Sequence, residues 1–589
     1  MARARTGGGD GRSEPAPPTG PGRRELIMVG EPDAELRVSP TSARSLTGAE
    51  LGDLAEIAAD PAVVIRPLFG ASEERVLAAE TAETAGVPVG ADGTGPTLAA
   101  EMARFYHVEA PDDRLDELAE QLRASPSVAG AYIKPPADLP VRSATLERLN
   151  EMAPAGEDAP PATPDFTSRQ GYLDAAPGGV DARWAWTQAG GRGDGVRIVD
   201  CEWGWRFTHE DLGQNQGGVI AGTADPTPDS RSTNHGTAVL GEISGDMNGI
   251  GVTGISPNAV ISASAFSVAS STAIRSAADR LGQGDIILLE IHRGGPNYPG
   301  GDTQFGFIAI EWWPDDYLAI RYAVTKGIVV VEAAGNGSQN LDDAVYDTAR
   351  PGFPSWWRNP FRRTALDSGA VIVGAGAPPS GNSGPDRSRL DFSNHGACVD
   401  AQGWGREVTS TGYGNLQGGT NVDLWYTNSF SGTSSASPIV VGALACTQGV
   451  LRANARPPLS PARARELLRS TGSPQQAAPG RPTTQRIGNR PNLRALIPAA
   501  LGNAQWTGVQ FRGQIGPRAT KQWFTFRWPA HWHVLWTVMP TSPQVGAPQI
   551  RFRTRVERAT DYYATYWISA VNLTDRPVDI EGRFAVLGW

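Results

Sequence analysis

The chain has 589 residues and a formal net charge of −10. This length predicts several domains, and the acidity argues against nucleic acid as a partner. Apolar runs stay well short of the roughly 18 residues that a membrane-spanning helix needs, so we expect no membrane span. The three cysteines are too few, and odd in number, for a disulfide framework, and no pair has metal-ligand spacing.

Residues 1–23 are rich in Gly, Pro, Ser and Arg, a composition typical of disorder. The apolar stretch that follows, residues 26–29, is too short for the core of a secretory signal. We therefore expect a cytoplasmic protein, with secretion by a route not visible in this chain as the alternative.

Residues 24–140 predict a small α+β domain. Strands are expected over 62–65, 104–108 and 129–133, and a helix over 112–123. Leu115, Leu118 and Leu122 would share one face of that helix. The next segment, residues 141–176, is rich in Pro, Ala and acidic residues and is predicted to be a linker.

Residues 177–500 predict an α/β domain. Apolar strands are expected over 196–200, 260–266, 285–291, 328–332 and 370–374, with helices between them such as 316–326. This alternation favours a mostly parallel sheet with helices on both faces. Residues 501–589 instead show the period of half-buried strands, which predicts an all-β sandwich or barrel with an aromatic core.

Four polar residues stand at the ends of these predicted elements. Ser434 lies where a Gly-containing turn enters an apolar helix, whose N-terminus favours a developing oxyanion. His235 lies at the start of a small-residue helix, and Asp200 ends a strand, where a carboxylate can orient an imidazole. Asn336, in Gly-Asn-Gly after another strand, offers an amide donor; the alternative is an Asn in a left-handed turn.

Together these motifs resemble those of the subtilisin-like serine proteases. The order is Val199-Asp200, His235-Gly236-Thr237, Ala334-Gly335-Asn336 and Gly432-Thr433-Ser434-Ser435-Ala436-Ser437-Pro438, within residues of about 180 to 475. The resemblance implies a serine endopeptidase with Ser434 as nucleophile, His235 as general base and then acid, and Asp200 as the orienting carboxylate. Asn336 and the Ser434 backbone N–H would hold the oxyanion.

The resemblance also implies partners and cofactors. The substrate would be a protein or peptide, and the domain at 24–140 resembles the family's inhibitory propeptide, removed by self-processing in the segment that follows. A permanent accessory domain is the alternative. No cofactor is expected; members often carry structural calcium, for which Asp342, Asp343 and Asp347 are the candidates here.

The chain departs from the family pattern in two places. After the acid the family usually has a small hydroxyl residue and then glycine, whereas Cys201-Glu202-Trp203-Gly204 follows here. Leu288 to Pro296 replaces the Ser-Leu-Gly strand that lines the substrate channel. We therefore expect Glu290, Gly294 and Gly295 to bind substrate; a structural role for Glu290 stays equally open.

Two other functions are compatible with parts of the sequence. The sedolisin-like acid peptidases share the Ser-Gly-Thr-Ser turn, but they use a Glu and Asp pair in place of His and an aspartate as oxyanion donor. His235 and Asn336 argue against them, and a rate that rises through an imidazole pKa near ~6.5 would distinguish the two. A catalytically silent scaffold or binding protein on the same fold is the alternative from another class.

Overall fold

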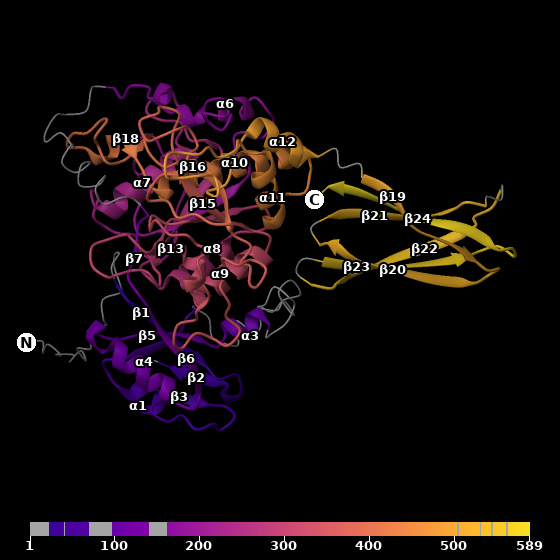
Figure 1. Ribbon diagram of the computed structural model, residues 1–589, viewed down its shortest axis with the longest axis horizontal. Helices are drawn as coiled ribbons and strands as arrows, with labels where there is room; N and C mark the ends of the chain where they lie inside the picture. Colours follow the sequence, from indigo (N-terminus) through magenta and orange to yellow (C-terminus); the bar gives the residue numbers. More distant parts are fainter. Residues whose placement is uncertain are drawn as a thin grey trace, which may run out of the picture.

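The computed structural model describes residues 23–39, 42–69, 97–140, 162–502, 506–530, 532–542, 546–560 and 563–588. Figure 1 shows these residues as an N-terminal α+β domain, a large central α/β region and an elongated C-terminal β domain. The predicted disorder at 1–23 lies almost entirely outside the described residues, as does most of the predicted linker.

The central region is built on a seven-stranded parallel sheet with strand order β16-β15-β14-β11-β8-β10-β9. The strands are β8 (Arg197–Glu202), β9 (Gln216–Ala221), β10 (Val260–Ala265), β11 (Ile286–Leu289), β14 (Val329–Ala333), β15 (Val371–Gly376) and β16 (Val399–Trp404). The predicted parallel sheet is confirmed, with one difference that matters later. Strand β8 continues past Asp200 to Glu202.

Helices cover both faces of this sheet. Helices α8 (Ser270–Arg280) and α9 (Pro314–Thr325) pack together on one face, and α7 (Arg231–Ser244) and α10 (Thr433–Ala453) pack together on the other (Figure 1). Helices α11 (Pro461–Thr471) and α12 (Leu493–Leu501) lie next to α10. By length and composition α10 alone among the described helices could cross a membrane, but here its most apolar stretch is entirely buried within the protein.

The central region begins earlier than predicted. Residues 162–176 were expected to be linker, yet Tyr172 and Leu173 are buried in the main hydrophobic core. Gln170 is also buried, and its side chain donates to Tyr172 Oη at 2.6 Å and to the Thr253 carbonyl at 2.9 Å. These contacts place 162–176 in the central region, which also includes the short helix α6 (Ala182–Ala185).

The N-terminal domain is a four-stranded antiparallel sheet with order β4-β5-β1-β6. The strands are β1 (Glu25–Gly30), β4 (Val64–Pro67), β5 (Phe105–Glu109) and β6 (Val128–Lys134); the helices are α1 (Leu54–Ala59), α3 (Leu98–Met102) and α4 (Leu115–Ala124), and β2 (Leu36–Ser39) pairs with β3 (Ser42–Ser45). The leucine stripe of α4 packs onto this sheet as its spacing predicts. The predicted α+β fold is therefore present.

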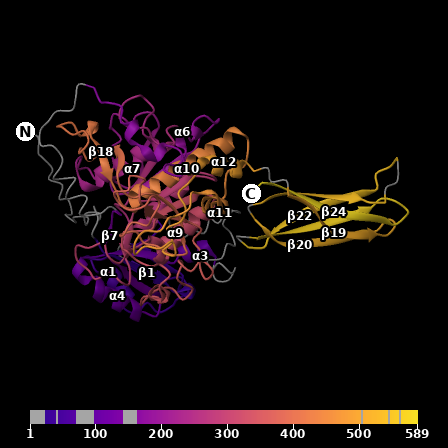
Figure 2. The same ribbon diagram turned by 45° about the horizontal axis from the view of Figure 1, so that its top comes forward.

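The N-terminal domain, with α1, α4 and β1, lies directly against the central region (Figure 2), and its strand β6 makes a close contact there. A Cβ on Gly130 would overlap the Gly352 carbonyl. The backbone of β6 and the backbone around Gly352 can therefore approach this closely only because both positions are glycine. The Tyr132 ring packs edge-on against Phe353, with ring centroids 4.9 Å apart. Shape complementarity therefore holds the N-terminal domain in one orientation.

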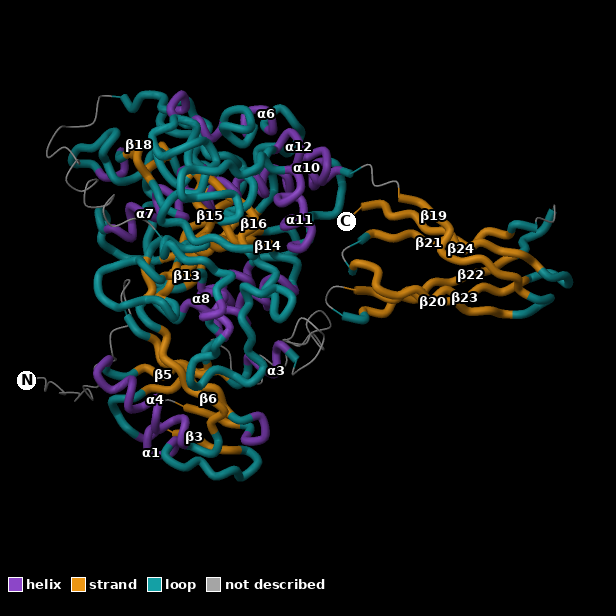
Figure 3. The backbone as a smooth tube through the Cα atoms, viewed as in Figure 1, coloured by secondary structure: helices purple, strands orange, loops and turns teal. Residues whose placement is uncertain are grey.

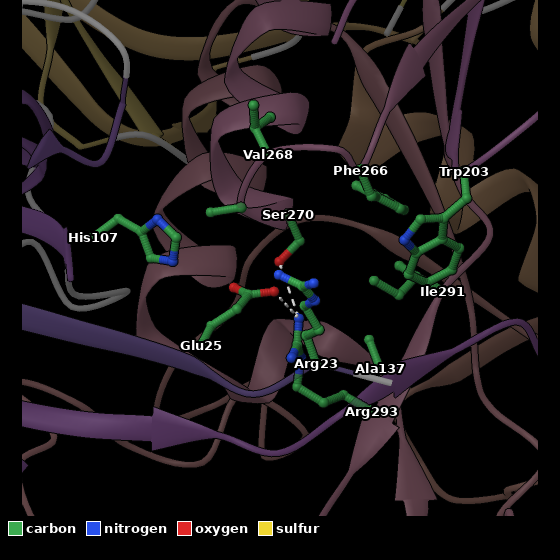
Figure 4. A pocket seen from close by; sticks show the side chains of 11 residues that line it. Arg23, Glu25, His107, Ala137, Trp203, Phe266, Val268, Ser270, Ile291 and Arg293 are labelled. Carbon is green, nitrogen blue, oxygen red and sulfur yellow. Dashed lines mark hydrogen bonds and ion pairs between the residues drawn. The ribbon is translucent and has the colours of Figure 1, made fainter. Parts of the chain in front are cut away.

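A buried ionic network joins the same two parts. Lys134, fully buried, lies 2.7 Å from both Asp315 and Asp316 at the start of α9. Beside it Arg293 pairs with Glu25 at 2.7 Å, and Figure 4 shows these two side chains facing each other in a small interface pocket. Each buried charge therefore has a partner of opposite sign from the other part of the chain.

The C-terminal domain is a sandwich of two three-stranded antiparallel sheets, β19-β24-β21 and β20-β23-β22 (Figure 3). Its strands are β19 (Trp506–Ile515), β20 (Thr520–Pro529), β21 (His533–Pro540), β22 (Ile550–Arg558), β23 (Tyr563–Asn572) and β24 (Val578–Gly588). Trp528, Trp536 and Phe584 lie between the sheets. This confirms the predicted all-β domain with an aromatic core.

Replacing Lys134 tests the ionic network. We expect Lys134→Met to lower the free energy of unfolding by about 3–5 kcal/mol, because Asp315 and Asp316 would stay buried without their cation. Arg66→Met is the matched control, since Arg66 is 51% exposed and pairs with Glu109 on the domain surface; it should cost no more than about 1 kcal/mol. Denaturant unfolding of the full chain measures both, and equal losses would contradict the role given to Lys134.

Candidate active site

The candidate site lies at the carboxyl edge of the parallel sheet. Strand β8 ends at Glu202, and Asn336 follows β14. Helices α7 and α10 point their first turns at the same edge and bring His235 and Ser434 there. The site therefore lies where parallel strands of an α/β sheet present their C-terminal ends.

His235 is held by Glu202. Its Nδ1–H donates to Glu202 Oε2 at 2.7 Å, and the ring lies edge-on to Phe430 with centroids 5.4 Å apart. Helix α7 can come this close to the end of β8 because residue 236 is glycine; a Cβ there would overlap the Gly204 carbonyl. The carboxylate thereby fixes which ring nitrogen carries the proton.

This contact corrects the prediction for Asp200. Asp200 Oδ2 accepts the indole N–H of Trp205 at 2.7 Å, and Asp200 makes no ion pair with His235. Successive side chains of a strand alternate between faces, so Asp200 and Glu202 share the face toward α7. Glu202, two positions further along and with the longer side chain, is the residue that reaches the His235 ring.

The other ring nitrogen of His235 is free. Nε2 is buried and has no hydrogen-bond partner among the described residues. Burial lowers the pKa of His235 well below 6.5, and the positive charge of Arg231 acts in the same direction. The ring is therefore neutral at pH 7, with a lone pair on Nε2 to accept a proton.

Ser434 occupies the first turn of α10. The preceding Gly432 has a φ of 110°, a conformation that favours glycine and turns the chain sharply into the helix. Ser434 Oγ and its backbone N–H both donate to the carbonyl oxygen of Pro140, at 2.9 and 3.3 Å. The serine hydroxyl and a backbone N–H of the first helical turn thus donate to the same carbonyl oxygen.

Asn336 is fixed beside this serine. Its Oδ1 accepts both the backbone N–H and the hydroxyl of Thr433, each at 3.0 Å, and its own N–H donates to His292 Nδ1 at 3.2 Å. These bonds leave Nδ2 as its available donor, and it contacts Gln304 Oε1 at 3.3 Å. The amide therefore has one orientation, set by the first turn of α10.

Residues 137–140 of the N-terminal domain enter the site. Strand β7 (Ala137–Asp138) pairs antiparallel with β12 (His292–Gly294), which pairs with β13 (Phe307–Ile308) on its other side. Leu139 and Pro140, the next two residues, are buried. This tail, residues 137–140, binds as an added strand and brings its last carbonyl to Ser434.

Two side chains of the central region hold the tail. Gln304 Nε2 donates to the Leu139 carbonyl at 2.9 Å and to Asp138 Oδ2 at 3.0 Å. Arg231, at the start of α7, pairs with Asp138 at 3.0 Å. Gln304 therefore touches both the tail and the amide of Asn336.

None of the three residues predicted to bind substrate pairs with the tail among the described residues. Glu290 is fully buried behind the site, where its Oε1 accepts the Ser437 hydroxyl at 2.8 Å, so the expectation that it borders the groove is not met. Gly294 pairs with Phe307, and the Gly295 N–H donates to the Gly306 carbonyl at 2.8 Å. The tail pairs instead with His292 and Arg293 of the same segment.

The calcium candidates are engaged in protein contacts. Asp342 accepts the Ala397 N–H, Asp343 caps a short 3₁₀ helix, and Asp347 pairs with Arg362 at 2.6 Å. Among the described residues no group of three or more His, Cys, Asp or Glu side chains is arranged to hold a metal ion. The candidate nucleophile, base and oxyanion donors are all protein groups, so catalysis through them would need no cofactor.

Sequence reasoning missed Glu202, His292 and Gln304. A signal for Glu202 was present, because an acid followed two residues later by glycine is the family pattern, and Glu202-Trp203-Gly204 has that spacing. His292 lies in the segment that replaces the family's Ser-Leu-Gly strand. Nothing in the sequence marked Gln304, whose role depends on how the loop before β13 folds.

Comparison with known proteins agrees with this geometry. Residues 207–488 match the subtilase family, and this match contains His235, Asn336 and Ser434. This segment of the chain is a subtilase domain. Subtilisin amylosacchariticus of Bacillus subtilis subsp. amylosacchariticus is 28% identical over 288 residues, 48% of this chain and 61% of that protein. Subtilisin DY of Bacillus licheniformis is 29% identical over 294 residues, 48% of this chain and 86% of that protein.

Two solved structures match the chain with low overall similarity. Fervidolysin from Fervidobacterium pennivorans has a TM-score of 0.42 at 16% identity, over 94% of this chain and 69% of that one. The epidermin leader peptide processing protease of Staphylococcus aureus has a TM-score of 0.42 at 17% identity, over 68% of this chain and 92% of that one. The chain spans about three fifths, 61%, of the first curated subtilisin that it matches.

Proposed function

We propose that the protein is a serine endopeptidase that acts through an acyl-enzyme on Ser434. The observation that carries this function is the Pro140 carbonyl, which accepts hydrogen bonds from Ser434 Oγ and from the Ser434 N–H. The chain's own tail thus occupies the site as a peptide substrate would. A silent scaffold would not need a free imidazole nitrogen, a fixed amide donor and a bound carbonyl in one place.

In this proposal each residue has a step. Ser434 Oγ attacks the carbonyl carbon while its proton passes to His235 Nε2, and Glu202 stabilises the imidazolium that forms. The oxyanion would accept hydrogen bonds from the Ser434 N–H and from Asn336 Nδ2, whose present bond to Gln304 Oε1 would then break. Loss of such an amide donor costs about 2.7–4 kcal/mol of transition-state stabilisation, a figure that comes from subtilisin. The C–N bond then breaks, and its nitrogen takes the proton from His235.

Deacylation follows the same path in reverse. Water gives its proton to His235 Nε2 and attacks the acyl carbon, and the ester bond to Ser434 Oγ breaks. The serine recovers its proton from His235. The products are a new carboxyl terminus and a new amino terminus, and the enzyme returns to its starting state.

The tail supports a self-processing precursor. Pro140 is the residue whose carbonyl lies at Ser434, so the bond to be cut is the one between Pro140 and Val141. The buried network around Lys134 and the antiparallel pairing of β7 hold the domain in place, which would make it an inhibitor until it leaves. A permanent accessory domain would not need its last described carbonyl at the nucleophile.

Self-processing gives a direct test. We expect the wild-type chain to convert into two fragments, the larger beginning at Val141, while Ser434→Ala stays intact. Electrophoresis and mass spectrometry of purified protein measure both. Cleavage of both proteins at this bond would show that another protease cuts it, and a first residue other than Val141 would contradict the register of the tail.

The carboxylate assignment has a test of its own. Glu202→Gln should slow self-processing about 10⁴-fold, by analogy with the Asp→Asn change in a serine-protease triad that leaves the imidazole in the wrong tautomer. Glu242→Gln is the matched control, because Glu242 lies on α7, is equally buried, and its carboxyl oxygens have no hydrogen-bond partner among the described residues. Equal rates for the two variants would rule out Glu202 as the orienting carboxylate.

A further inference from the structure

Two carboxyl groups stand side by side behind the imidazole. Asp200 and Glu202 are fully buried and share one face of β8. One oxygen of each accepts a hydrogen bond of 2.7 Å: Asp200 Oδ2 from the Trp205 indole, and Glu202 Oε2 from His235 Nδ1. The Cys201 backbone N–H also contacts the Asp200 carboxyl group. Asp200 was predicted to orient His235, but Glu202 is the carboxylate that contacts the ring, so Asp200 has no assigned function.

The two remaining oxygens have no donor. Asp200 Oδ1 and Glu202 Oε1 are buried, and no group in the described part of the chain donates a hydrogen bond to either atom, while the two carboxyl groups lie within hydrogen-bonding reach of each other. Buried polar atoms are rarely left in this condition, and two adjacent buried carboxylates would repel each other strongly. One proton between Oδ1 and Oε1 satisfies both atoms and removes one of the two charges.

The surrounding groups provide no other compensation. Around the pair and His235 lie Glu290 after β11, Glu242 and Arg231 on α7, Cys201 on β8, His292 on β12 and Tyr413 after strand β17 (Val408–Thr411). Among the described residues, no Lys or Arg forms an ion pair with either carboxyl group, and Arg231 pairs with Asp138. The nearby acids Glu290 and Glu242 make a second negative charge less favourable still.

We propose that Asp200 is a positioning residue that shares one proton with Glu202, so that a singly charged carboxyl–carboxylate pair orients His235. When the imidazolium forms, the shared proton moves toward Asp200 Oδ1 and the full negative charge comes to lie on Glu202, next to the ring. No proton leaves the pair during the cycle. The Trp205 indole keeps Asp200 aimed at its partner.

Burial supports this arrangement electrostatically. It raises the pKa of Asp200 to about 6 and that of Glu202 well above its usual range, while the neighbouring charge of Asp200 acts in the same direction on Glu202. At pH 7 the pair therefore holds a proton rather than two charges. The pKa values belong to the pair, because the two groups titrate together.

Two substitutions at Asp200 separate this role from simpler ones. Asp200→Asn keeps the shape, accepts the indole N–H through Oδ1 and donates to Glu202 through Nδ2, as a protonated aspartate does. Asp200→Ala removes that donor. Because this role rests on the proposed endopeptidase activity, wild-type cleavage of a peptide with the sequence of residues 134–146 is established first, and its absence would count against the proposed function instead.

The expected kinetic pattern is specific. Asp200→Asn should keep kcat within about threefold of wild type, whereas Asp200→Ala should lose at least about tenfold in kcat with little change in KM. Equal losses in both variants, or no loss in either, would overturn the proposal.

An infrared measurement tests the shared proton without activity. Full-length Ser434→Ala and Ser434→Ala/Asp200→Asn proteins are compared at pH 7. The double variant should lose the C=O stretching absorption of one protonated carboxyl group. Loss of carboxylate absorption alone would show that Asp200 is ionised in the wild type and would refute the pair, whatever the kinetics.

Discussion

The hydrogen bond between His235 Nδ1 and Glu202 Oε2 is the interaction on which the chemistry of this site depends. It fixes the proton on Nδ1 and leaves Nε2, which has no other partner, as the base. Three parts of the fold converge to make it: β8 extends to Glu202, α7 begins just before His235, and the Gly204–Gly236 contact lets the two approach. A bulkier residue at either glycine would separate acid from base.

A second constraint determines what reaches that site. Lys134 and Tyr132 secure the last strand of the N-terminal domain against α9, only three residues before the tail pairs with β12. The tail is therefore a short tether from a fixed point to the nucleophile. Rigid docking of the domain and the position of the Pro140 carbonyl are two consequences of one interface.

Much of this organisation was predictable from the sequence. The apolar strands and the helices between them gave the parallel sheet, and alternation with aromatic residues gave the C-terminal sandwich. His235, Asn336 and Ser434 were found because each stands in a short motif at the end of an element. The early start of the central region was missed, because the Pro- and Ala-rich composition of residues 141–176 hid the buried Tyr172 and Leu173.

The errors at the site have a common cause. Asp200 and Glu202 share a strand face, so periodicity could not choose between them, and the choice depended on where β8 ends and on side-chain length. Glu290 was predicted to border the groove because it belongs to the segment whose residues His292 and Arg293 pair with the tail, yet its side chain turns to Ser437 in the core. Hydrogen-bond partners between distant segments, such as Gln304 with the tail, follow from the tertiary fold alone.

Labelling of the processed protein with a fluorophosphonate probe tests the central claim most directly, because the probe reacts only with an activated serine. Peptide mapping should place one adduct on Ser434, and the adduct should be absent when the processed protein is labelled after His235 has been alkylated. No adduct, or an adduct on Ser437 or another serine, would contradict a nucleophile activated by His235 and Glu202.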